Sequence, residues 1–343
     1  MTFVWWSVTL LALTNVALAA AIVGLRIRSE QRDRRNAAIE ARWQPRLFAL
    51  IACEVAAEDL ADDVPEGDLG HLLELCGRFA QRLTGADLNR IEAFAGRFAW
   101  RLARRLREDD VDGRAKSVML LSAIGGHRYE HSLKAALDDP DPVVAMVAAQ
   151  AVAKHRMVEE IPRLVERVSA LGVWSPAFVA GVVAAVGSAA SPSLMQLLQS
   201  DECSTTERST AALALTELRD PRAADAAVAV LKGDETDREL VTGCLRILEE
   251  VGQPKHLWPI RRLLDHDDFA VRARAAAALG ALGTAADAET LGRLVADPSR
   301  WVALNAAVGL RRLHREDMLL VLAAGDDASA PIAAEALELE VVG

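Results

Sequence analysis

The chain has 343 residues, a formal net charge of −10, and a composition that is 52% hydrophobic but only 4% aromatic. Nucleic-acid-binding proteins neutralise phosphates with clustered Lys and Arg, so this acidic balance argues against nucleic acid as a partner. The cysteines include no Cys-x-x-Cys pair and predict reduced, helix-packed thiols in a reducing compartment: Cys53, Cys76, Cys203 and Cys244.

The first 25 residues differ in composition from the rest of the chain. Residues 3–25 carry no charged side chain over 23 positions, and a helix of that length, at about 1.5 Å per residue, spans the ~30 Å hydrocarbon core of a bilayer. Residues 1–25 are therefore predicted to be a transmembrane anchor. The alternative is a cleaved signal peptide, because Ala17-Leu18-Ala19 fits a cleavage site, although no Lys or Arg precedes the apolar run.

The charges beside this stretch predict its orientation. Residues 1 and 2 carry no charged side chain, whereas five arginines follow the apolar run: Arg26, Arg28, Arg32, Arg34 and Arg35. By the positive-inside rule, the C-terminal bulk of the chain is cytoplasmic. We expect a single-pass protein of the inner (cytoplasmic) membrane with a cytoplasmic C-terminal domain.

Three residues inside the apolar stretch predict contact with another membrane helix. Asn15 lies near mid-membrane, where a side-chain amide seeks a polar partner. Ala20 and Gly24 are four residues apart and small enough for close helix approach. The alternative is a passive anchor with an incidental amide.

Residues 26–113 form a juxtamembrane neck that lacks the periodicity of the following region. Helices are predicted over residues 26–57, 69–83 and 86–107, with an acidic, turn-rich break at residues 62–68. The first of them should bury one apolar stripe, formed by Trp43, Leu47, Phe48 and Ile51.

The predicted helix over residues 86–107 has two unlike faces. At about 100° per residue, one arc is apolar and contains Ile91, Phe94, Ala95, Phe98, Leu102 and Leu106. Trp100 lies on the other side, together with Arg97, Arg101 and Arg104. A tryptophan among arginines predicts a surface that meets the anionic inner leaflet or a membrane-bound partner. The alternative is a solvated arginine face.

An apolar position recurs through the rest of the chain. Its spacings are 31, 34, 29, 33, 31 and 31 residues, at Leu121, Val152, Val186, Leu215, Leu248, Leu279 and Leu310. This period predicts stacked helical hairpins, each of which buries its apolar face against its neighbours. The predicted fold is all-α, with a solenoid over residues 114–343, and such a surface usually binds rather than catalyses.

Acidic residues gather at the bends between the predicted hairpins. Residues 117–343 carry 22 basic and 32 acidic side chains, so the whole net charge of −10 belongs to this region. Asp141, Asp268 and Asp297 stand where a helix begins, which is typical of capping residues. Stacked bends would also form a negatively charged ridge that a basic segment of a partner could bind.

One segment of the solenoid carries a family resemblance. Asp268-x-x-Val271-Arg272-x-x-Ala275-Ala276-x-Ala278-Leu279-Gly280 resembles the HEAT-like repeats first described in phycobilisome lyases. The resemblance covers roughly residues 114–343 and implies a HEAT-like α-solenoid.

The layout of the whole chain carries a second resemblance. One membrane helix, an arginine-rich neck with Trp43-Gln44-Pro45 and terminal repeats resemble membrane-anchored bacterial HEAT-repeat proteins that accompany glycosyltransferases of polysaccharide production. This resemblance implies a scaffold or adaptor that binds a partner protein, with a membrane glycosyltransferase as the candidate.

Signals for catalysis are weak throughout the chain. There is no His-Glu dipeptide of the kind that holds iron in HEAT-like hydroxylases, and no glycine-rich phosphate loop. His127 and His131 have the spacing of metal ligands on a helix but no nearby third ligand. We expect no metal, no cofactor and no enzyme activity. The alternative is a bilin-lyase-like or metal-dependent HEAT-repeat enzyme.

Overall fold

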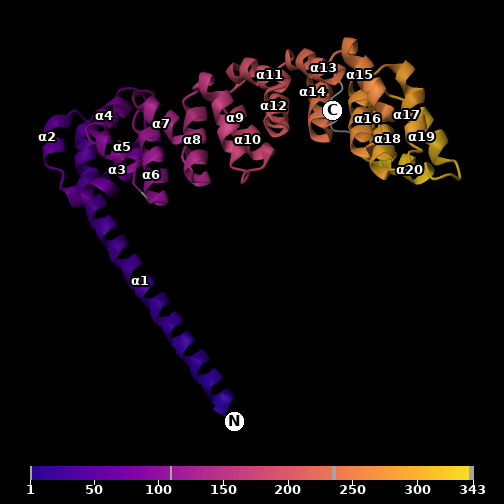
Figure 1. Ribbon diagram of the computed structural model, residues 1–343. Coiled ribbons are helices and arrows are strands. Elements are labelled where there is room, and N and C mark those ends of the chain that lie inside the picture. Colours follow the sequence, from indigo (N-terminus) through magenta and orange to yellow (C-terminus); the bar gives the residue numbers. More distant parts are fainter. Residues whose placement is uncertain (1, 109, 234–236, 340–343) are drawn as a thin grey trace. The chain divides into compact units, whose positions relative to one another are not determined.

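The computed structural model describes residues 2–108, 110–233 and 237–339, and for residues 2–22, 24, 25, 28 and 126 it describes the backbone only. All regular secondary structure in these described ranges is helical (Figure 1). The chain divides into two compact units, unit 1 (Met1–Ser132) and unit 2 (Leu133–Gly343), which are described separately below. This division falls later in the chain than the boundary predicted between residues 113 and 114.

Unit 1 is a group of six helices. They are α1 (Thr2–Ile51), α2 (Ala57–Asp62), α3 (Glu66–Ala80), α4 (Gly85–Gly96), α5 (Ala99–Arg105) and α6 (Val111–Ala123). The part of α1 beyond residue 38 packs on α3 and α4. Trp43 is fully buried there, and its indole N–H donates to Asp68 Oδ2 at 3.0 Å. The buried ring and its polar partner together fix α1 against α3.

Two expectations for the neck need correction. The helix predicted over residues 26–57 is the second part of the single helix α1, which continues through Pro45 to Ile51. Trp43 and Leu47 are buried as predicted, but Phe48 is 51% exposed and meets Phe79 edge-on at 5.5 Å. Phe48 therefore lies at the border of the core rather than within it.

The helix predicted over residues 86–107 is broken between α4 and α5. The peptide N–H groups of Arg97 and Phe98 donate three residues back, to Phe94 and Ala95, which tightens the chain into a turn. Gly96 weakens the helix at this point, and its carbonyl accepts a long hydrogen bond from Tyr129 Oη at 3.5 Å. The apolar arc survives the break, because Ile91, Phe94, Ala95 and Leu102 are all buried.

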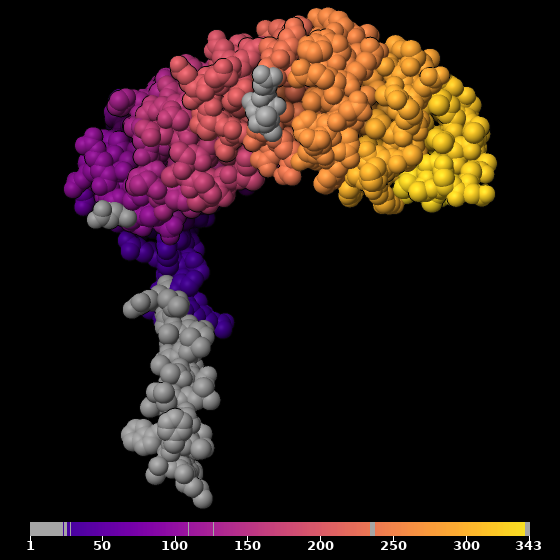
Figure 2. Space-filling view, turned by 45° about the vertical axis from the view of Figure 1, so that its right-hand side comes forward, coloured from indigo at the N-terminus to yellow at the C-terminus, as the bar shows by residue number. Residues whose placement is uncertain are grey.

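Unit 2 is a series of helical hairpins. They comprise α8 (Pro142–Lys154), α9 (Ile161–Ala170), α10 (Pro176–Ala184), α11 (Ser191–Gln199), α12 (Thr205–Leu218), α13 (Ala223–Lys232), α14 (Arg238–Val251), α15 (Leu257–Arg262), α16 (Phe269–Leu282), α17 (Ala288–Leu294), α18 (Arg300–Arg312), α19 (Glu316–Ala323) and α20 (Ala330–Glu338). The helix α7 (Glu130–Ala136) crosses the boundary between the units. The even-numbered helices α8 to α18 form one layer and the odd-numbered helices α9 to α17 form the other (Figure 1). In the space-filling view, the colours of unit 2 follow one another in chain order from magenta to yellow (Figure 2), as expected when hairpins stack in the order of the sequence.

The predicted repeat register is confirmed. All seven recurring apolar side chains are at most 1% exposed, and Leu279 is completely buried. The helices of one layer approach closely because small residues stand at their contacts. A Cβ atom added to Gly280 of α16 would lie 2.4 Å from Gly309 Cα of α18. The backbones of these two helices are therefore in direct contact.

Asp141 and Asp268 cap helices as predicted, and so does Asp237, whereas Asp297 accepts the N–H of Ser299 just before α18. Side chains of Asp141, Asp237 and Asp268 accept hydrogen bonds at 2.7 to 2.9 Å from peptide N–H groups in the first turns of α8, α14 and α16. Others form ion pairs, since Asp138 binds Arg163 and Arg167. The acidic residues at the bends therefore have structural roles, as helix caps or as members of ion pairs.

None of the four cysteines, all of which lie in the described residues, forms a disulfide bond, as expected, but only two of them are packed. Cys76 and Cys244 are buried, whereas Cys53 is exposed and Cys203 is half-buried. Burial raises the pKa of the Cys76 thiol to about 12, so it stays protonated and unreactive near neutral pH.

Candidate functional site

The layer of even-numbered helices in unit 2 carries two adjoining grooves, one on each side of α10. The α8–α10 groove has a volume of about 440 Å³ and is lined by Gln150, Ala153, Lys154, Ala177, Phe178, Gly181, Val182 and Ala185. The α10–α16 groove has a volume of about 460 Å³ and is lined by Ser175, Pro176, Ala177, Ser209, Leu213, Glu239, Thr242, Gly243, Arg246, Ala270 and Arg274. Because Ala177 lines both, one elongated ligand can occupy the two grooves together.

The α8–α10 groove is apolar, and its aromatic edge is held in place. Phe178 is 45% exposed and stacks on Trp174, with ring centroids 5.2 Å apart. The Trp174 indole N–H donates to the carbonyl of Pro142 at 3.3 Å, which ties this pair to the start of α8. Ser175 caps α10 by accepting the Phe178 N–H at 3.3 Å. The groove therefore presents a pre-formed apolar recess, which suits a buried anchor side chain.

The α10–α16 groove is polar and crosses four helices. Small residues give it room, since Gly243 is buried and a Cβ atom there would lie 3.0 Å from the Cβ of Ala212 on α12. Arg246 is exposed and has no ion pair or hydrogen bond among the described residues. The groove thus presents an exposed arginine that has no described partner, together with the carboxylate of Glu239, which also lines it.

The wall formed by Arg274 is rigid rather than free. Arg274 Nη1 lies 3.0 Å from Glu249 Oε2, and Arg312 Nη1 lies 2.9 Å from Glu249 Oε1. Glu249 is only 16% exposed and joins α14, α16 and α18 through these two pairs. Arg274 therefore supports the groove, whereas Arg246 is the arginine available to a ligand.

The neck surface predicted from the sequence is present on α5 and the preceding turn. Trp100 is 58% exposed, and the Arg101 guanidinium lies 5.1 Å from its ring centroid. Arg97 pairs with Glu58 at 3.3 Å and Arg101 with Glu66 at 2.7 Å. Arg104 is exposed and has no described partner. The free positive charge beside Trp100 is thus smaller than the count of arginines suggests.

The predicted membrane-packing residues Asn15, Ala20 and Gly24 lie in α1, outside the side chains that the structure describes. Among the described residues, no single helix combines the length and apolarity needed to cross a bilayer. One consecutive pair, Pro176–Ala184 with Ser188–Gln199, reaches that apolar length only together and is bent by 110°.

The described residues do not form a metal site. His127 and His131 are both exposed. Over residues 2–108, 110–233 and 237–339, no three His, Cys, Asp or Glu side chains gather in a way that could hold a metal ion. No described constellation therefore resembles a metal centre.

Sequence reasoning did not find the two grooves. Their lining residues come from α8, α10, α12, α14 and α16, and they converge only when the hairpins stack. One signal was available, because small residues such as Ala177, Gly243 and Ala270 occupy helix faces on which a solenoid can expose a groove.

Part of the repeat region matches a known protein family. Residues 236–311 match the family model for HEAT repeats. Curated protein sequences give no significant match.

Several solved structures are similar to the chain. The complex of CpcE and CpcF of phycocyanin lyase from Nostoc sp. PCC7120 is 18% identical, with a TM-score of 0.34, over 70% of this chain and 86% of that one. The karyopherin Kap121p bound to the SUMO protease Ulp1p is 11% identical, with a TM-score of 0.48, over 80% of this chain. The match covers only 37% of the Kap121p chain.

The stacked hairpins and the family match agree with each other. The matched residues 236–311 include α14, α16 and most of α18, and earlier hairpins of unit 2 repeat the same arrangement. Residues 236–311 are therefore similar to HEAT repeats, and the described hairpins that precede them in unit 2 have the same helical arrangement.

Proposed function

We propose that this protein is a non-catalytic, membrane-anchored scaffold that binds a segment of a partner protein across the α8–α10 and α10–α16 grooves. The observation that carries the proposal is the pairing of an apolar recess beside Phe178 with the unpaired charge of Arg246, in two grooves that share Ala177. Among the described residues, no three His, Cys, Asp or Glu side chains gather in either groove in a way that could hold a metal ion.

The chemistry of the grooves indicates what the partner segment carries. A large apolar side chain fits the recess at Phe178, because such anchors supply most of the binding energy at protein interfaces. A carboxylate further along the segment suits Arg246, because an arginine forms two parallel hydrogen bonds with a carboxylate. The expected partner segment is therefore amphipathic, with an apolar anchor and an acidic residue.

The membrane anchor in this proposal is the uncharged stretch of residues 3–25. The arginines that follow it support a cytoplasmic position for both units, at the inner membrane. Tethering raises the concentration of the grooves near other membrane proteins to roughly the millimolar range, so weak contacts suffice for binding.

The partner is proposed to be membrane-associated. A membrane glycosyltransferase of polysaccharide production is the candidate, on the strength of the layout of anchor, neck and repeats. This identity is the most specific part of the proposal and has its own test in the crosslinking experiment below.

Site-specific photo-crosslinking in native membranes tests the binding surface. A photoreactive residue at Thr242 in the α10–α16 groove should form an adduct with one protein, which mass spectrometry identifies. The same residue at Ala229, exposed on α13 in the other layer, is the control and should form none. Equal adducts at both positions would place the binding surface elsewhere.

Reporter fusions test the anchor independently. A cytoplasm-only reporter fused after Gly343 should be active, and a periplasm-only reporter at the same place should be silent. The opposite pattern would reverse the orientation and exclude a cytoplasmic partner.

A further inference from the structure

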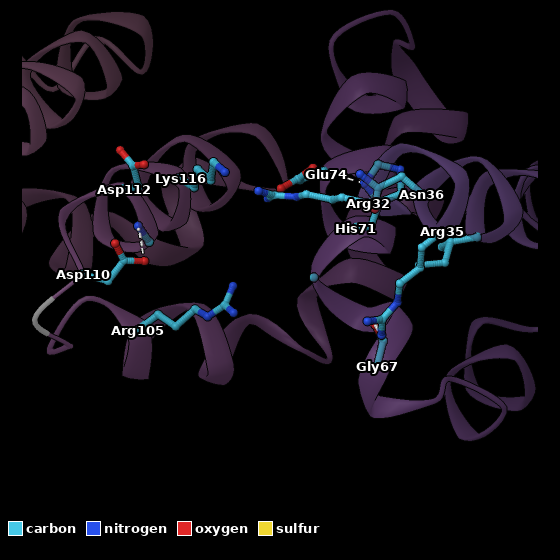
Figure 3. Close-up of a pocket in the computed structure, with 13 residues that line it drawn as sticks. Arg32, Arg35, Asn36, Gly67, His71, Glu74, Arg105, Asp110, Asp112 and Lys116 are labelled. Carbon is cyan, nitrogen blue, oxygen red and sulfur yellow. Dashed lines mark hydrogen bonds and ion pairs between the residues drawn. The ribbon is translucent and has the colours of Figure 1, made fainter. Parts of the chain in front are cut away.

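Unit 1 contains a third recess, which the proposed function does not use. It has a volume of about 400 Å³ and lies among α1, α3, α5 and α6. We call it the α1–α6 cavity. Its most prominent feature is the number of cationic side chains in its wall (Figure 3).

Three cations from three different helices point into this cavity. They are Arg32 of α1, Arg105 of α5 and Lys116 of α6, and Figure 3 shows their side chains converging on the space between the helices. None of the three has an ion pair or hydrogen bond among the described residues. Like charges gathered in one recess repel each other, and a bound anion would relieve that repulsion.

A fourth cation is fixed in the wall by the backbone. Arg35 Nη2 donates to the carbonyl of Gly67 at 2.9 Å. A Cβ atom on Gly67 would lie 2.9 Å from the same nitrogen, so a larger residue there would require the Arg35 side chain to shift. At Gly70, one turn further along α3, an added Cβ atom would meet nothing within 4 Å. That part of the wall is open space in which a ligand can lie.

Two of the three carboxylates in the lining contact neighbouring lining residues. Asp110 accepts the Gly113 N–H at 3.0 Å and caps α6. Glu74 Oε2 lies 3.3 Å from His71 Nδ1. The carboxylate of Asp112 points away from Arg32 and Arg105 in Figure 3. The lining contains four Arg or Lys side chains against three carboxylates, so cations outnumber anions in the wall.

We propose that the α1–α6 cavity binds a phosphate-bearing anion held by Arg32, Arg105 and Lys116. A phosphate group has several oxygens that accept from converging guanidinium and ammonium donors at once. A volume of about 400 Å³ lies in the usual range for small-ligand pockets, roughly 300 to 1,000 Å³.

The phosphate group that binds in the cavity can come from either of two sources. Arg32 stands seven residues after Leu25 (32 − 25), which is about 10 Å along a helix at 1.5 Å per residue. If residues 3–25 cross the bilayer, a lipid phosphate at its surface can reach the cavity. The other source is a soluble phosphate compound.

The test uses the full chain in nanodiscs of zwitterionic phosphatidylcholine, with inorganic pyrophosphate as the probe and calorimetry as the readout. Arg32→Gln with Arg105→Gln should weaken pyrophosphate binding about tenfold or more. The matched control, Arg82→Gln with Arg107→Gln, removes the same charge from exposed, unpaired arginines outside the cavity and should bind like the parent. Equal affinities in all three proteins, or equal losses in both variants, would overturn the proposal.

A variant that fills the cavity sterically distinguishes loss of the binding site from loss of the fold. Gly70→Ala should retain pyrophosphate binding, whereas Gly70→Leu, which fills the open part of the wall, should lose it while keeping the parent's melting temperature. Binding by Gly70→Leu at parental affinity would contradict the placement of the ligand.

A second set of nanodiscs separates the two sources. If a lipid phosphate is the ligand, phosphatidylglycerol in the nanodisc should suppress pyrophosphate binding by the parent. If the ligand is soluble, pyrophosphate binding should persist in those nanodiscs. Either result supports the site and identifies its source. The test does not involve the grooves of unit 2, so its failure would leave the proposed partner-binding function untouched.

Discussion

Arg272 binds both carboxylate oxygens of Asp297, with its Nε at 2.9 Å from one and its Nη2 at 3.1 Å from the other. Its Nη1 also donates to the carbonyls of His266 and Asp267, at 2.8 and 2.9 Å. The two partners lie 16% and 8% exposed. One arginine therefore joins the bend before α16 to the bend before α18, and this contact explains why the HEAT-like motif places an arginine after Val271.

Removing Arg272 should destabilise unit 2 strongly. Arg272→Ala leaves Asp297 largely buried without its cation, which typically costs about 3 kcal/mol of unfolding free energy. Arg293→Ala, at an exposed position, should change the free energy by no more than about 0.5 kcal/mol. Urea denaturation of both variants measures the difference, and equal values would mean that the Arg272 contact is not stabilising.

Stability should fall in acid through the aspartates of these pairs. Burial raises the pKa of Asp297, but hydrogen bonds from Arg272 and the Ser299 N–H outweigh it and leave the pKa below its ordinary value. The Arg222 hydrogen bond lowers the pKa of Asp220 in the same way. A lowered folded-state pKa gives stability that is present above the ordinary aspartate pKa, about 4, and is lost as the pH falls through the folded-state pKa.

Denaturation across pH checks this expectation. The unfolding free energy should decrease from about pH 4 downward, and Asp297→Asn should be less stable at neutral pH but lose less on acidification. An acid slope unchanged by Asp297→Asn would contradict the assignment.

The centre of the repeat should not tolerate a charge. Leu279 is completely buried, so Leu279→Asp loses a packed leucine and buries an unpaired carboxylate, which together cost several kcal/mol. Ala281→Asp adds the same charge two residues along α16 at an exposed position and should cost about 1 kcal/mol or less. Melting temperatures of the two variants compare them directly, and similar losses would show that the register is misplaced.

The contact between α16 and α18 should not tolerate a methyl group. Gly280→Ala places a Cβ atom 2.4 Å from Gly309 Cα, so the helices must separate, at a cost of about 1 to 3 kcal/mol. Gly181→Ala on α10 is the control, because the nearest side-chain atom to the added Cβ would be Glu217 Oε2 at 4.0 Å and alanine favours the helix by up to about 1 kcal/mol. Opposite shifts in melting temperature are expected, and a stabilised Gly280→Ala would refute the close approach.

The surface around Trp100 should affect binding but not folding. Trp100→Ala with Arg104→Ala changes two exposed side chains and should leave the melting temperature unchanged. If this surface meets anionic lipid or a membrane-bound partner, the variant should show reduced binding to liposomes or reduced partner crosslinks. A lipid contact should weaken as salt rises, because exposed charges are screened beyond about 10 Å at 0.1 M. If the variant matches the parent in both liposome binding and partner crosslinking, the surface around Trp100 is solvated and does not bind.

The repeated core of the solenoid was predictable because its signal is local. Val271 and Leu279 recur with the hairpin period, and burial follows from that period whatever the partner helix is. Gly96 shows the limit of such reasoning. It lies on a helical pattern that continues to residue 107, but the contact of its carbonyl with Tyr129, 33 residues away, accompanies a break in the helix.

Arg274 shows the same limit at the candidate site. Its position on α16 suggests an exposed side chain, yet stacking brings it to Glu249, which also binds Arg312, 63 residues away from that glutamate. Arg246 lies on the neighbouring helix, α14, and its side chain has no described partner. Which arginine is free depends on how hairpins stack, and a single sequence does not contain that geometry.

The most direct test of the central claim is the effect of Arg246→Glu on partner capture in native membranes. A photoreactive residue at Thr242 reports contact with the partner. Arg246→Glu reverses the charge of a side chain that pairs with no described residue. The crosslink yield should fall about tenfold or more, while the melting temperature stays within a few degrees of the parent. Lys232→Glu makes the same charge change on α13 in the other layer and should leave the yield unchanged. A parental yield with Arg246→Glu, or an equal loss with Lys232→Glu, would contradict binding of the partner in the α10–α16 groove.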